Sequence, residues 1–96
     1  MEAARLRAEM VTNWRRYAEK LADAIREVLP DAEVLVFGSV ARGEHIAASD
    51  VDILVISNEM PEDMLGRARI KVEIERRAGL PYYHPFELHI ARGERG

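Results

Sequence analysis

The order of apolar patterns in this 96-residue chain predicts an α/β (α+β) fold, a small mixed β-sheet with helices packed on one face. The first observation is a run from residue 2 to residue 29 with an apolar residue at every third or fourth position. The second is a pair of short apolar segments, at residues 33–37 and 51–56. The third is a further helical segment followed by one that alternates apolar and polar residues. No linker divides the chain, so we expect residues 1–96 to form one domain.

The N-terminal segment predicts one continuous amphipathic helix over residues 2–29. It is rich in Ala, Glu, Arg and Leu, which favour helices. Pro30-Asp31 is expected to end it. We expect most of its apolar stripe to pack on the sheet, and an exposed remainder would mark a partner interface. The stripe comprises Leu6, Met10, Trp14, Tyr17, Leu21, Ile25 and Val28.

Three segments predict strands. Residues 33–37 are β-branched and aromatic, and residues 51–56 are almost continuously apolar, as expected for a strand covered on both faces. Residues 86–91 alternate apolar with polar side chains, which predicts a strand with one face on the core.

A second helix is predicted from Pro61 to Arg77. Pro61 suits a first-turn position, and the acidic residues Glu62 and Asp63 suit a helix N-terminus. Gly79 and Pro81 are expected to end it.

Composition excludes several classes of function. The formal net charge is −3 and the pI is near 5.6, so a general nucleic-acid or membrane-surface binder is not expected. Cysteine is absent, which removes disulfides, thiolate nucleophiles and thiolate metal sites. No apolar run reaches the length of a signal or membrane segment, so we expect a cytoplasmic protein.

Two aspartates at the start of the second strand are the main candidates for chemistry. Asp50 and Asp52 are two residues apart, so they project to the same side of the chain. Unpaired, such carboxylates repel each other, and a hard divalent cation such as Mg²⁺ between them would relieve the repulsion. Glu87 lies on the polar side of the last strand and is expected to join them, giving a three-carboxylate site able to hold two metal ions.

A phosphate site is predicted directly upstream of these aspartates. Gly38 lets the backbone approach an anion, and the Ser39 hydroxyl can donate to a phosphate. If residues 40–42 begin a helical turn, its N-terminus adds partial positive charge, and Arg42 could add a cation.

Simpler interpretations remain for each of these residues. A Ser-Asp sequence is common in turns, Glu87 could be an ordinary exposed residue, and Arg42 could merely cover its turn. The three histidines share no metal-ligand spacing, so surface or hydrogen-bonded roles are expected for them, with a reservation for His89 because it shares a face with Glu87. They are His45, His84 and His89.

The combined pattern resembles a known active-site signature. It consists of Gly38-Ser39, ten further residues, and then Asp50-Val51-Asp52, with Ala41-Arg42-Gly43 after the serine and Ser49 before the first aspartate. This resembles the DNA polymerase beta-like nucleotidyltransferase superfamily, in particular the minimal nucleotidyltransferases of bacteria and archaea. The resemblance covers nearly the whole chain.

The resemblance implies an enzyme. Gly38 and Ser39 would hold the triphosphate, Asp50 and Asp52 would bind Mg²⁺ (with Mn²⁺ as a substitute), and Glu87 would complete the set where the family more often has Asp. It further implies transfer of a nucleoside monophosphate, most plausibly AMP from ATP, to a hydroxyl. The chain would act as the antitoxin of a HEPN-domain ribonuclease toxin and modify that toxin. The alternative is a binding module with weak or no catalysis that neutralises its partner sterically, and homo- or hetero-oligomer formation is left open.

Overall fold

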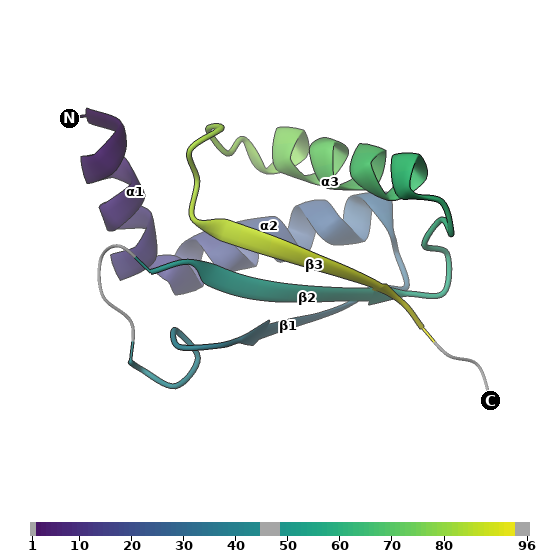
Figure 1. The fold of residues 1–96 in the computed structure, drawn as a ribbon, viewed down its shortest axis with the longest axis horizontal. Coiled ribbons are helices and arrows are strands. Elements are labelled where there is room, and N and C mark those ends of the chain that lie inside the picture. The colour runs from purple at the N-terminus through teal and green to yellow at the C-terminus, as the bar shows by residue number, and fades with distance from the viewer. Residues whose placement is uncertain (1, 45–48, 94–96) are drawn as a thin grey trace.

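The computed structural model describes residues 2–44 and 49–93, which form three helices and three strands (Figure 1). In chain order these elements are α1 (Glu2–Thr12), α2 (Trp14–Val28), β1 (Glu33–Phe37), β2 (Val51–Ser57), α3 (Met64–Ala78) and β3 (Phe86–Arg92). None of the helices in these residues is long and apolar enough to cross a lipid bilayer.

The strands form a mixed sheet in the order β1-β2-β3. β1 runs antiparallel to β2, and β3 runs parallel to β2. The parallel pair is joined by α3, which crosses back over the same face of the sheet as α2 (Figure 1). The expected α+β architecture, with helices packed on one face of a small mixed sheet, is confirmed.

The core lies between the helices and the sheet. From β2 it takes Val51, Ile53 and Val55, which are fully buried. Ile25 of α2 and Ile74 of α3 are fully buried on the opposing side. The alternating segment in β3 packs as expected, because Phe86 and Leu88 are buried while Glu87 and His89 are exposed.

The expectation that β2 is covered on both faces is wrong. Its other face carries Asp52, Leu54 and Ile56, which are only half-buried. In the described part of the chain α2 and α3 both cover the Val51 side, so nothing there covers the opposite one (Figure 1). We call the surface formed by the outward-facing residues of the three strands the open face; it includes Leu35, Phe37, Asp52, Leu54, Ile56, Glu87 and His89.

The continuous N-terminal helix predicted over residues 2–29 is also wrong. It is divided at Asn13 into α1 and α2, which run in different directions (Figure 1). The side chains of Thr12 and Asn13 bond back to the carbonyls of Ala8 and Glu9, at 3.0 and 3.1 Å, and such bonds compete with helix continuation. The change of direction lets Val11 enter the core, where it is fully buried.

The second predicted helix begins later than expected, because Asp63 caps it. The Asp63 carboxylate accepts a hydrogen bond from the Gly66 N–H at 2.8 Å, so Pro61 lies before α3 and not in its first turn. The predicted end is confirmed, since Gly79 adopts a left-handed conformation with φ of 70° and its N–H bonds back to Arg76.

Candidate active site

The sheet register brings two of the predicted carboxylates directly together. Asp52 of β2 is paired with Glu87 of β3, and on its other side with Phe37 of β1. Neighbouring strands lie about 4.8 Å apart, and paired residues point to the same face. Asp50 lies two residues before Asp52, directly ahead of β2. Backbone geometry therefore places all three acidic residues at one end of the open face.

Both signature aspartates are engaged by side chains of the chain itself. Arg7 Nη2 of α1 donates to Asp50 Oδ1 at 2.5 Å, and His89 Nε2 donates to Asp52 Oδ1 at 3.1 Å. Glu87 is exposed. With the side chains in these positions, no three His, Asp or Glu side chains of the described residues converge as a metal site. We call Asp50, Asp52 and Glu87 together the acidic row. A cation that binds the acidic row must therefore draw the side chains of Asp50 and Asp52 toward itself.

Gly38 is required at the end of β1 for two reasons. Its φ of 86° lies in the left-handed region, which a side chain disfavours. A Cβ at this position would also collide with the Asp52 carboxylate. The glycine therefore allows the Gly38 backbone and the Asp52 carboxylate to lie close together, which brings the predicted phosphate-binding turn next to a predicted metal ligand.

The segment after Gly38 forms the expected helical turn. The Arg42 N–H is shared between the carbonyls of Gly38 and Ser39, at 3.3 and 3.2 Å, and the Glu44 N–H donates to the Ser39 carbonyl at 2.9 Å. Val40 is buried and anchors the turn to the core. Arg42 itself is exposed and forms an ion pair with Glu44 at 3.0 Å, so its phosphate role stays a prediction.

The histidines occupy different environments. His84 Nδ1 accepts from the Phe86 N–H at 3.0 Å, so its Nε2 carries the hydrogen and donates to Glu75 at 2.6 Å. This is the hydrogen-bonded, structural role that was expected. His89 instead lies in the candidate site, where its ring also contacts Phe37 at a centroid distance of 5.1 Å. His45 lies outside the described residues.

Arg7 is the site residue that the sequence did not indicate. It is 43 residues from Asp50 in the chain and belongs to the polar side of what looked like one long helix. A basic residue on a helix rich in Arg carries no local signal. Only the break at Asn13 turns α1 toward the start of β2 and brings the two residues together.

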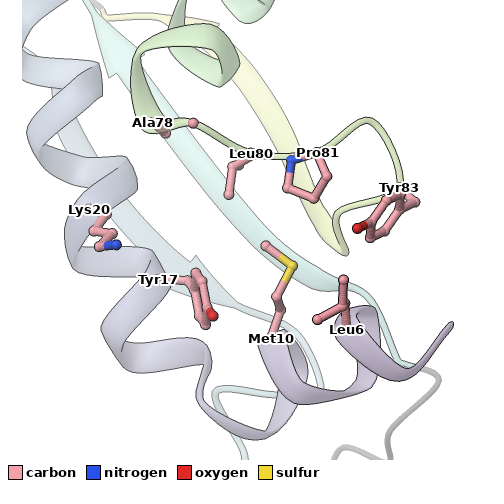
Figure 2. Close-up of a pocket in the computed structure, with 9 residues that line it drawn as sticks. Leu6, Met10, Tyr17, Lys20, Ala78, Leu80, Pro81 and Tyr83 are labelled. Atoms are coloured by element: carbon pink, nitrogen blue, oxygen red, sulfur yellow. The ribbon is translucent and has the colours of Figure 1, made fainter. Parts of the chain in front are cut away.

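A separate cavity of about 200 Å³ lies between α1, α2 and the segment that follows α3 (Figure 2). Its lining is mostly apolar and shares no residue with the candidate site. Leu6 and Met10 of α1 face Leu80, Pro81 and Tyr83 across it. The packing of α1 against this segment is therefore incomplete. The remaining lining residues are Tyr17, Lys20, Ala78 and Gly79.

Comparison with known proteins agrees with this geometry. A family model described as a nucleotidyltransferase domain matches residues 18–88, which include β1, the Gly38-Ser39 turn, both aspartates and Glu87. No curated protein matches the chain. A crystal structure of a candidate nucleotidyltransferase from Sulfolobus solfataricus has the same fold, with a TM-score of 0.62 and 22% identity over 94% of this chain and 74% of that one. Because the family model spans most of the sequence, the chain belongs to the nucleotidyltransferase domain family.

Proposed function

We propose that this protein is a Mg²⁺-dependent nucleotidyltransferase that transfers AMP from ATP to a hydroxyl group and releases pyrophosphate. The family assignment supports nucleotidyl transfer in general. The observation that carries the finer proposal is the pairing of Asp52 with Glu87 beside Asp50, with Gly38 in contact with the Asp52 carboxylate. An all-oxygen donor set of this kind suits Mg²⁺, and Mn²⁺ could replace it.

Each residue of the site has a distinct role in this proposal. Asp50, Asp52 and Glu87 hold the metal, which when bound would activate the attacking hydroxyl and neutralise charge on the phosphates. Gly38 lets the triphosphate approach the backbone, and the Ser39 hydroxyl donates to a phosphate oxygen. Arg42 can leave Glu44 for the phosphates, because an exposed ion pair costs little to break.

The open face supports a protein as the acceptor. Leu35 is 50% exposed and Phe37 is 40% exposed, and Leu54 lies between Leu35 and His89 in the register. This apolar surface is continuous with the acidic row, so a protein that covered it would bring its own side chains to the proposed metal site. We propose a HEPN-domain toxin as this partner, with the chain acting in the cytoplasm as its antitoxin by adenylylating a tyrosine or similar hydroxyl.

One observation favours a second candidate function. Asp50 and Asp52 already have partners within the chain, Arg7 and His89, and the carboxylates do not converge. A protein that used the same open face only to cover its toxin would need no metal. The second candidate is therefore a binding module that neutralises its partner sterically.

The experiment combines the protein with ATP labelled on the α-phosphate, Mg²⁺ and the product of the adjacent gene, which we propose to be the HEPN-domain partner. We expect label on the neighbour, and we expect Asp50→Asn with Asp52→Asn to reduce it by more than about a hundredfold, since the metal ligands are lost. Asp23→Asn is the matched control, because Asp23 is exposed on α2 and outside the site. Neutralisation that survives the double substitution without any labelling would instead establish the steric module.

A further inference from the structure

We propose that Arg7 is a substrate-binding residue, which pairs with Asp50 in the metal-free protein and binds the triphosphate once metal occupies Asp50. This inference rests on the proposed function. Its basis is the ion pair between Arg7 Nη2 and Asp50 Oδ1 at 2.5 Å. Arg7 lies on α1, outside residues 18–88, which the family model matches.

The acidic row needs a cation when metal is absent. Asp52 and Glu87 are paired in the register and Asp50 is two residues away, so three negative groups share one end of the open face. Such groups repel each other unless positive charge lies among them. The Arg7 guanidinium supplies that charge, and its side chain is only 28% exposed, whereas that of Asp50 is 60% exposed.

A divalent ion on Asp50 removes the reason for this pairing. The ion and the guanidinium compete for the same carboxylate. The ion carries twice the charge, so its attraction to the carboxylate is the stronger. Phosphates held by such an ion would lie within a few ångströms of Asp50. A guanidinium presents planar paired N–H donors that fit phosphate oxygens, so Arg7 exchanges one anion for another over a short distance.

The packing of α1 permits this exchange. α1 is separated from α2 by the break at Asn13, and the cavity beside Leu6 and Met10 leaves it room to shift (Figure 2). Arg5, one position before Leu6, pairs with Glu2 of the same helix at 2.7 Å and does not reach the site in this structure. Arg5 and Arg7 therefore form a matched pair for substitution.

The test measures binding by calorimetry in the absence of any acceptor, with Mn²⁺ alone, Mg²⁺-ATP and AMP as probes. We expect Arg7→Ala to weaken Mg²⁺-ATP binding about tenfold, as for the loss of one strong charge-assisted contact. AMP affinity should be unchanged, and Mn²⁺ alone should bind as tightly or more tightly. Arg5→Ala should match the wild type with every probe. If Arg7→Ala does not fold, Arg7→Lys keeps the charge without the planar fork and should give an intermediate loss.

Three results would overturn the inference. Unchanged Mg²⁺-ATP affinity in both folded variants would show that Arg7 does not touch the phosphates. Mn²⁺ binding that weakens in parallel with ATP would show that Arg7 only orients Asp50. A wild-type protein that binds no Mg²⁺-ATP would defeat the proposed function and this inference together, whereas the first two results leave the proposed function intact.

Discussion

The two faces of β2 perform opposite tasks although they alternate along one strand. Toward the helices, Val51, Ile53 and Val55 are fully buried and hold the layers together. On the open face, Asp52 and Leu54 are half-buried, and Asp52 belongs to the acidic row. The period of two residues in a strand makes this division possible in seven residues. In so small a domain, residues that stabilise the fold and residues of the candidate site therefore alternate along the same strand. They are separated because their side chains point to opposite faces of the sheet.

The largest expected effect tests the stabilising face. We expect Ile53→Ala to lower the free energy of unfolding by about 2–5 kcal/mol, because it leaves a cavity between the sheet and the helices. Leu54→Ala, one residue later, should cost about 1 kcal/mol, because its side chain is only half-buried. Chemical denaturation with an unchanged m-value measures both. Equal losses for the two variants would contradict the assignment of the faces.

An intermediate effect is expected at the start of the reactive face. Gly38→Ala should lower the free energy of unfolding by about 1–2 kcal/mol through the left-handed conformation, and it should displace the Asp52 carboxylate. A displacement of this kind should reduce nucleotidyl transfer by about a hundredfold.

Gly43→Ala is the control for Gly38→Ala. Gly43 has a similar φ of 72°, but apart from its two chain neighbours no atom of the described residues lies within 4 Å of the position that a Cβ would take. It should share the loss of stability while transfer stays close to the wild-type rate. If both variants lost transfer alike, backbone strain and not the contact with Asp52 would be the cause.

The smallest effect on stability is expected within the exposed part of the open face. Leu35→Ser should change the free energy of unfolding by no more than about 0.5 kcal/mol, because Leu35 is 50% exposed on an edge strand. It should nevertheless weaken binding to the partner about fivefold, which corresponds to roughly 1 kcal/mol of lost apolar contact. Val72→Ser is the control, since Val72 is similarly exposed on α3. If Val72→Ser weakened binding more than Leu35→Ser does, the partner would bind the helices and not the open face.

Local patterns predicted the strands well and the helices less well. β1 has the predicted bounds, and β2 and β3 each extend one residue beyond the predicted bounds. The strands were predictable because residues that favour strands are bounded in the sequence by turn residues. The end of α3 at Gly79 was also predicted, since the left-handed C-cap is a property of one residue type. The break at Asn13 was missed, because the apolar stripe continues through it and only local back-bonding and the burial of Val11 mark the division.

The sequence by itself determined the strands, the Gly38-Ser39 turn and the side of the sheet on which Asp52 and Glu87 lie. Those features follow from short-range rules: glycine tolerates a left-handed conformation, and side chains alternate along a strand. Only the tertiary structure decided that Asp52 and Glu87 are paired, that one face stays open and that Arg7 reaches Asp50. These depend on strand register and on the direction of α1, which are set by burial of side chains distant in the chain.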